Sequence, residues 1–575
     1  MSKSLHAMVI AAIGFALPTP LLAETDAGSY LAARQAGFDG DYVQASRYFM
    51  SALQDDPSHV PLMEQTLTSL LGTGQVDQAA NIAAKLNDLG MNSQIANIAV
   101  FAYSVKAGDW DAVFTMLEEG HEVGPLLDGL GQAWAYVGKG QMDRALMSFD
   151  EVIDTPGLGN FGQQHKAMAL TMVGDLEAAE AIYSLPPSEG IVPTRASVIA
   201  HLQILCRLGD FAKAGDMMDR AFGSASDPEL AALRNAIEAG DIPAIGPVVS
   251  TPAEGIAFAM VSLSNILQGE ANESYLLLYA QAARYLAPDD AAADIAAARL
   301  LNEMGQYDTA ARTFAEVSPS DMAFHEAELG RAEALRLGDH LEQATEVLSN
   351  LTRSYPDLPR TYVSLGDALR QQGDYEGAKE AYDAALARYP EGASARWWVL
   401  YTRGIAQERM GAWDGAEADF RASLALNPDH PSVLNYLGYS LVDRGMSAHY
   451  EEALEMIKTA VAERPNSGAI TDSLGWAYYK LGRFEEAVTP LETAAELAPN
   501  DPVISDHLGD AYWMVGRYNE AEFQWRRALS FGPEAEVEDR IRRKLQVGLD
   551  AVYAEEGFTP PAPVEVASDD RLNDG

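Results

Sequence analysis

Prolines recur along the second half of the chain at a regular spacing of 34 residues. Pro356 and Pro390 are separated by this interval, and the same interval separates Pro465 from Pro499 and Pro499 from Pro533. A constant period of this length is typical of proteins built from repeated structural units. Each unit in such an array contacts mainly its neighbours along the chain, so we expect a stack of repeats and not a fold around one central core.

A second pattern repeats inside each interval. Gly373-Asp374-Tyr375 is followed three residues later by Ala378 and four residues after that by Tyr382. Glycine can end a helix in the left-handed conformation, proline stops the next helix, and the apolar residues follow a helical period. The pattern therefore predicts two amphipathic helices per repeat, whose apolar faces are buried only when neighbouring repeats stack. The same turn signal occurs at Gly40, Gly108, Gly174, Gly209, Gly482 and Gly516.

These residues resemble the pattern of the tetratricopeptide repeat family. The resemblance extends from about Asp26 to Ala535 and is clearest after Pro359. It implies an all-α fold, a right-handed α-solenoid (superhelix) of about fifteen stacked helix–turn–helix units.

The first residues have the layout of a secretory signal peptide. Lys3 precedes an apolar run at 7–17, Pro18 and Pro20 interrupt the chain, and Ala23 comes directly before polar residues. We predict cleavage after Ala23 and a periplasmic location. The alternative is an ordinary first helix packed on the array. No cysteine lies near this position to accept a lipid, and no later segment is long and apolar enough for a transmembrane helix.

The repeat pattern decays near the middle of the chain, where Pro243, Pro247 and Pro252 interrupt the predicted helices. This segment is either a hinge or a drifted repeat that still stacks. At the other end, Arg540 and Lys544 belong to a basic patch, which we assign to the polar outer side of a terminal helix. The expected organisation is a signal peptide at 1–23, an N-terminal array at 24–227, a degenerate repeat or hinge at 228–256, a C-terminal array at 257–535, a capping helix at 536–553 and a disordered acidic tail at 554–575.

Charge and motif content argue against nucleic-acid binding and against catalysis. The chain has 84 Asp and Glu against 40 Lys and Arg, and phosphate binding depends on clustered Lys and Arg. Cys206 is the single cysteine, so no cysteine-based metal site is expected. The glycines at 157–162 match a dinucleotide-binding pattern but follow a predicted helix and not a strand. We therefore expect no catalytic residues, no metal and no cofactor.

The remaining functional surface is the concave groove, which the first helix of each repeat lines in this family. The resemblance places ligand contacts at the second, fifth, ninth, twelfth and thirteenth positions of a repeat. Aromatic rings beside hydrogen-bonding groups suit an extended peptide. The alternative is that Trp476 and Trp513 pack between helices and the aspartates bridge them. Trp397 and Trp398 form a second candidate contact. The predicted groove residues are Asn435, Tyr439, Asp443, Asp472, Trp476, Tyr479, Lys480, Asp506, Asp510 and Trp513.

The segments 435–439 and 472–476 resemble a subgroup of bacterial envelope tetratricopeptide proteins. Some members are outer-membrane lipoprotein adaptors that bind processing proteases. The resemblance implies an exported, non-enzymatic scaffold or adaptor whose partners are proteins, such as an envelope protease or assembly factor. The chain departs from these adaptors because it lacks the lipid-acceptor cysteine. A structural component of a periplasmic polysaccharide-export or secretion assembly is the alternative function, and an enzyme or small-ligand binder is a third.

Overall fold

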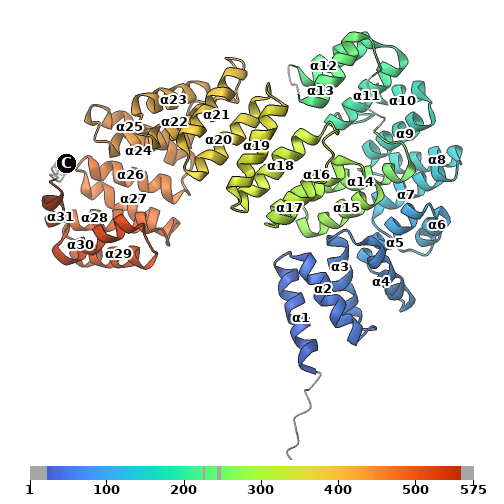
Figure 1. Cartoon of the computed structure of the whole chain (residues 1–575), viewed down its shortest axis with the longest axis horizontal. Helices are drawn as coiled ribbons and strands as arrows, with labels where there is room; N and C mark the ends of the chain where they lie inside the picture. Colours follow the sequence, from blue (N-terminus) through green and yellow to red (C-terminus); the bar gives the residue numbers. More distant parts are fainter. Residues whose placement is uncertain (1–22, 224–226, 243–247, 558–575) are drawn as a thin grey trace, which may run out of the picture. The chain divides into compact units, whose positions relative to one another are not determined.

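The computed structural model describes residues 23–223, 227–242 and 248–557, and these contain 31 α-helices, one short 3-10 helix and no β-strand (Figure 1). The fold is therefore all-α, as the repeat pattern predicts. The chain divides between Leu351 and Thr352, inside α19 (Leu341–Ser354), into two compact units. The predicted signal peptide, apart from Ala23, and most of the predicted tail lie outside the described residues.

The first unit consists of consecutive hairpins, each pairing with the next along the chain. Its helices before α19 are α1 (Ala23–Phe38), α2 (Tyr42–Asp55), α3 (Val60–Gly72), α4 (Val76–Asp88), α5 (Gln94–Ala107), α6 (Trp110–Glu118), α7 (Pro125–Gly138), α8 (Met142–Asp154), α9 (Gly159–Val173), α10 (Leu176–Tyr183), α11 (Arg195–Leu208), α12 (Phe211–Phe222), α13 (Pro228–Ala239), α14 (Pro252–Ile266), α15 (Glu273–Leu286), α16 (Ala291–Glu303), α17 (Tyr307–Phe314) and α18 (Phe324–Leu337).

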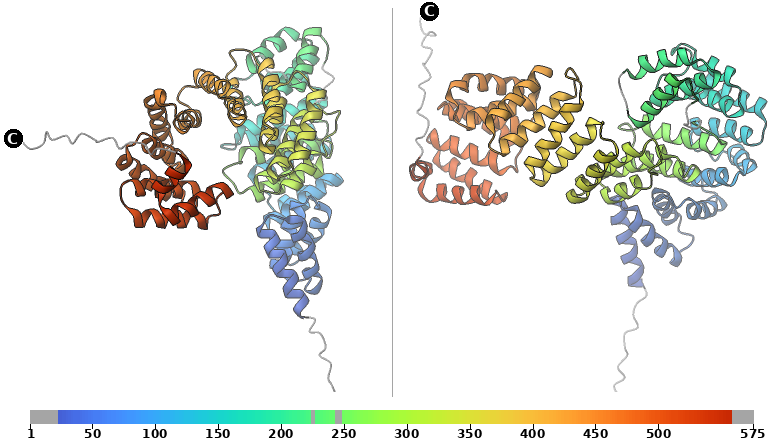
Figure 2. Two further views of the ribbon diagram at one scale, coloured as in Figure 1. Left: turned by 60° about the vertical axis from the view of Figure 1, so that its left-hand side comes forward. Right: turned by 45° about the horizontal axis from the view of Figure 1, so that its top comes forward.

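The second unit continues with hairpins of the same kind, which Figure 2 shows from two further sides. Its helices are α20 (Pro359–Gln372), α21 (Tyr375–Arg388), α22 (Arg396–Arg409), α23 (Trp413–Leu426), α24 (Pro431–Asp443), η1 (Ser447–His449), α25 (Tyr450–Glu463), α26 (Gly468–Lys480), α27 (Phe484–Leu497), α28 (Pro502–Met514), α29 (Tyr518–Ser530), α30 (Ala535–Val547) and α31 (Leu549–Glu556).

Glycines fix both the turn and the close packing within a hairpin. Gly373 ends α20 with φ +84°, and the Asp374 side chain accepts a hydrogen bond from the backbone N–H of Gly377 to start α21. Within α20, a methyl group at Gly366 would overlap the ring of Tyr382 on α21. The absence of a side chain at Gly366 therefore lets the aromatic ring lie against the first helix. Gly404, Gly475 and Gly509 meet Phe420, Leu491 and Trp525 in the same way.

The first unit has a long-range contact that the repeat pattern did not predict. Here the first-helix face of a unit means the side formed by the first helices of successive hairpins. α14 packs against α7 and α9, and α15 packs against α3 and α5, so later helices cover this face of the early hairpins (Figure 1). Gly255 on α14 lies so close to Trp134 on α7 that a methyl group there would overlap the indole. The early hairpins therefore bury their first-helix face within the chain.

Candidate partner-binding site

The ten predicted groove residues lie on α24, α26 and α28, which are the first helices of three successive hairpins. α26 packs against both α24 and α28, so the three helices are neighbours and their equivalent positions form one surface. Sequence spacing alone predicted this arrangement. The contacts of each side chain depend on the tertiary structure.

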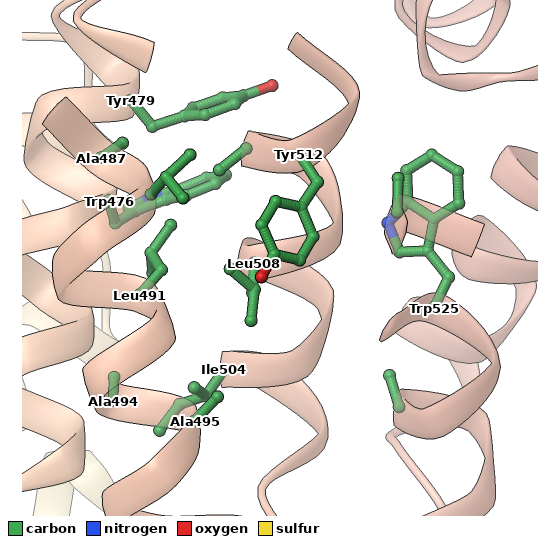
Figure 3. Close-up of a cluster of buried hydrophobic side chains, with 14 of the residues drawn as sticks. Trp476, Tyr479, Ala487, Leu491, Ala494, Ala495, Ile504, Leu508, Tyr512 and Trp525 are labelled. Atoms are coloured by element: carbon green, nitrogen blue, oxygen red, sulfur yellow. The ribbon is translucent and has the colours of Figure 1, made fainter. Parts of the chain in front are cut away.

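Trp476 on α26 is buried in a stack of rings. Its ring centroid lies 4.8 Å from that of Tyr479 and 3.9 Å from that of His507 on α28, both nearly parallel, and Trp476 is 8% exposed. Figure 3 shows Tyr479 and Trp476 lying one above the other in the cluster that also holds Leu508. Trp476 therefore packs between helices α26 and α28 in this conformation.

The neighbouring imidazole carries a charge partner. His507 Nδ1 lies 2.9 Å from an oxygen of Asp472, and both side chains are buried. Burial by itself lowers the pKa of His507, but Asp472, with Asp506 and Asp510 nearby, outweighs this effect, and the pKa is raised. The carboxylates thus stabilise the charged form of His507. The sequence pattern singled out Asp472 and Asp506 but missed His507, although it directly follows Asp506 in the same helix.

The acidic positions of α28 hold a lysine from the C-terminal helix α30. Lys544 Nζ lies 2.8 Å from both oxygens of Asp506 and 2.6 and 2.8 Å from those of Asp510. Trp525 Nε1 donates a further hydrogen bond of 2.9 Å to Asp510. Burial raises the pKa of Asp510, Lys544 lowers it and Asp506 raises it, and the net direction is upward. The Lys544 side chain is 0% exposed, which differs from its expected place on the outer side of a terminal helix.

The helices α30 and α31 cover two more of the predicted positions. Trp513 Nε1 donates a 3.0 Å hydrogen bond to Asp550, and Gly548 lies against the Trp513 ring. The hydroxyl groups of Tyr479 and Tyr553 are 2.9 Å apart. The first-helix face of the last hairpin, with part of the preceding one, is therefore occupied by the chain's own C-terminal helices.

The predicted residues nearer the start of the second unit are less enclosed. Asn435 and Tyr439 on α24 are half-buried, and Asp443 pairs with Lys480 at 3.6 Å. The Lys480 ammonium also lies 5.3 Å from the Trp476 ring centroid. These residues form the edge of the predicted groove on the side away from α30.

An aromatic surface continues onto the preceding hairpin. Trp398 on α22 is 40% exposed, and its ring lies 5.6 Å from Trp397 and 5.7 Å from Tyr401. Tyr401 in turn lies 6.1 Å from Tyr436 on α24. We call Trp398, Tyr401 and Tyr436 the open aromatic surface. It joins Trp398 of the second candidate contact to α24, the helix that carries the predicted groove residues Asn435 and Tyr439.

The described residues contain no helix with the length and apolar character needed to cross a membrane.

Comparison with known proteins supports the repeat assignment. A family model described as "Tetratricopeptide repeat" matches residues 363–399 and 401–445, and one described as "TPR repeat" matches residues 475–516. A TPR repeat-containing protein of Pseudomonas aeruginosa is 32% identical over 186 residues, which are 32% of this chain and 30% of that protein.

Two other similarities are more limited. The cellulose synthase operon protein C of Xanthomonas axonopodis pv. citri is 30% identical over 165 residues, which are 27% of this chain and 10% of that protein. A crystal structure of a tetratricopeptide repeat protein from Parabacteroides merdae is 15% identical with a TM-score of 0.34, covering 51% of this chain and 98% of that chain. The chain thus spans less than a third of either curated relative. The family models and the helical hairpins together identify the chain as one that carries tetratricopeptide repeats.

Proposed function

We propose that this protein is a scaffold that binds a protein partner on the first-helix face of its second unit. The observation that carries this proposal is the open aromatic surface. Tryptophan and tyrosine supply large apolar contacts at protein interfaces, and Trp398 keeps 40% of its surface exposed. In the first unit, α14 and α15 cover the equivalent face of the early hairpins. The second unit therefore offers more of its first-helix face to a partner.

The predicted groove residues divide into two sets under this proposal. Asn435 and Tyr439 lie on the same helix as Tyr436 of the open aromatic surface and are placed to contact a partner directly. The second set already makes contacts within the chain, which a partner must replace in order to bind there. This second set is Asp443, Asp472, Trp476, Tyr479, Lys480, Asp506, Asp510 and Trp513.

Binding can be tested by exchanging one aromatic residue. A tagged Trp398→Ala chain should recover much less partner from a cell-envelope extract than the unchanged chain. The matched control is Phe523→Ala on α29, which removes an aromatic residue that is 65% exposed on a second helix of a hairpin. Equal recovery by the Trp398→Ala and unchanged chains would contradict the proposed surface.

We further propose that the scaffold acts in the cell envelope, where an envelope protease or assembly factor is its partner. The signal-peptide layout of the first residues supports export. N-terminal sequencing of the protein from cells should find Glu24 as the first residue. A chain that still begins at Met1 would contradict export.

A structural role in a polysaccharide-export assembly is the second candidate function. The similarity to a cellulose synthase operon protein favours it, although the matched segment is only 10% of that protein. This role predicts that the chain is recovered in one fixed multi-protein complex, and that deleting it stops polysaccharide export. An adaptor would instead be recovered with a partner that binds and dissociates.

A further inference from the structure

α30 and the residue that directly follows it present three residues toward α28 at four-residue intervals. Arg540, Lys544 and Gly548 follow this spacing at and just beyond the helix, and residues four apart lie on one helix face. Arg540 lies 3.7 Å from Asp510, and Lys544 binds both Asp506 and Asp510. Gly548 lies against Trp513, where a larger side chain would overlap the ring. We call Asp506, Asp510 and Trp513 the α28 seat.

The seat is selective for a cation. Two carboxylates on adjacent turns of α28 surround one ammonium group, whose three N–H donors fit the four carboxylate oxygens within 2.8 Å. The Lys544 ammonium also lies 5.7 Å from the Trp525 ring centroid. An apolar or acidic side chain in this place would leave two buried carboxylates without the ammonium that balances their charge, which is strongly unfavourable.

α30 contributes one fully buried apolar residue, Ile541, and two partly buried ones, Val537 and Leu545, to the apolar cluster of the last hairpins. α31 adds the buried Leu549 and Val552 and the partly buried Tyr553. The charged contact between Lys544 and the seat adds to this apolar packing in holding α30 in place. The charged contact involves side chains alone and does not require that the two helices belong to one chain. A helix of another protein that supplies the same charged groups can therefore make it.

We propose that the α28 seat is a docking site for a helix of a protein partner, and that α30 occupies it in the partner's absence. The partner helix would present a basic residue, a lysine and a small residue at four-residue intervals. A helix is favoured over an extended strand because residues at four-residue intervals lie on one face of a helix and advance only about 6 Å per interval, so that all three can reach the two turns of α28 that carry the seat. This inference rests on the proposed function, and it adds the chemistry of the partner and the segment that competes with it.

The test uses the full chain and a synthetic peptide of residues 535–556. The Lys544→Gln chain keeps the seat but weakens its own occupant, so it should bind the labelled peptide at least tenfold more tightly than the unchanged chain does, as measured by fluorescence anisotropy. A peptide carrying Lys544→Gln should not bind. A peptide carrying Arg542→Gln should bind like the unchanged peptide, because Arg542 pairs with Glu538 on the exposed side of α30.

A second chain keeps the test decisive if Lys544→Gln disturbs folding. Leu549→Ser removes an apolar anchor of α31 and leaves all three seat residues and Lys544 unchanged, and circular dichroism checks that either chain is folded. The inference is overturned if no folded variant binds the peptide, or if the Lys544→Gln peptide binds equally well. If the peptide does not bind but partner recovery still depends on Trp398, this inference is contradicted and the proposed function is not.

Discussion

Both units cover part of their first-helix face with later helices of the same chain, but they use opposite chemistry. In the first unit, α14 packs through Gly255 onto the buried ring of Trp134. In the second unit, α30 packs through the ammonium of Lys544 onto two aspartates. Apolar close packing does not depend on charge, whereas a buried ion pair does. The first contact is therefore insensitive to charge, whereas the second depends on a cation, which the helix of the proposed partner would also supply.

The buried histidines show the same contrast. His165 accepts a 3.1 Å hydrogen bond from Trp134 Nε1 and lies against Phe258 of α14, and burial lowers its pKa to about 3. His507 has the Asp472 carboxylate beside it, so despite burial its pKa is raised. The first unit thus keeps a neutral imidazole in an apolar contact, and the second favours an imidazolium in a charged one.

The largest effect is expected from breaking the charged contact. Lys544→Met removes the ammonium that lies between the buried Asp506 and Asp510, and it should lower the free energy of unfolding of the second unit by about 3–5 kcal/mol. The measurement is urea denaturation, with hydrogen exchange of α28 to locate the change. Lys458→Met is the control, because Lys458 pairs with Glu455 at the surface and should cost at most about 1 kcal/mol. Equal effects of the two changes would contradict a buried charged contact.

A smaller loss of stability should follow from adding a side chain at the apolar contact between α14 and α7. Gly255→Ala places a methyl group on the Trp134 ring and should destabilise the first unit by about 1–3 kcal/mol. Faster hydrogen exchange in both α7 and α14 would show that the two helices separate together. Gly28→Ala in α1 meets no atom within 4 Å and should be neutral or slightly stabilising. Unchanged exchange in α7 would show that α14 is not held there.

Acid should weaken the first unit through His165. The native pKa is about 3 against an unfolded value of 6.5, so the unfolded state binds the proton more tightly. This stability is fully present above pH 6.5 and is lost as the pH falls, by about 2 kcal/mol at pH 5. His165→Gln keeps an acceptor for Trp134 and should remove this part of the pH dependence. The measurement is the unfolding free energy of the first unit, followed by hydrogen exchange of α9.

The smallest change in stability is expected from the titration of His507 in the second unit. Its pH dependence is opposite to that of His165. The native pKa of His507 lies above 6.5, so its stabilising contribution is fully present below pH 6.5 and is lost as the pH rises through the native pKa. The change in unfolding free energy is small because burial lowers the pKa of His507, whereas the carboxylates raise it. Asp472→Asn should flatten the dependence, and Trp476 fluorescence should report the change because its ring stacks on His507. A second unit that becomes more stable on alkalinisation would contradict this assignment.

The sequence by itself predicted the repeating hairpins, their turns and the helices that carry the groove positions. These features are local: Gly373 ends one helix, Asp374 begins the next, and Gly366 leaves room for Tyr382, all within one repeat. The period then places equivalent residues of α24, α26 and α28 on one surface. The signal peptide, the middle hinge or drifted repeat and partner binding in the groove remain predictions.

Only the tertiary structure decided what covers that surface. A helical period shows which residues share a face, but it does not show which distant element the face meets. Gly255 lies against Trp134, although more than 100 residues separate them in the sequence, and no local pattern relates the two. Lys544 belongs to a basic patch and also faces α28, and its sequence neighbours do not distinguish a solvated lysine from a buried one. The two acidic positions of α28 decide this, because a buried pair of carboxylates requires a cation.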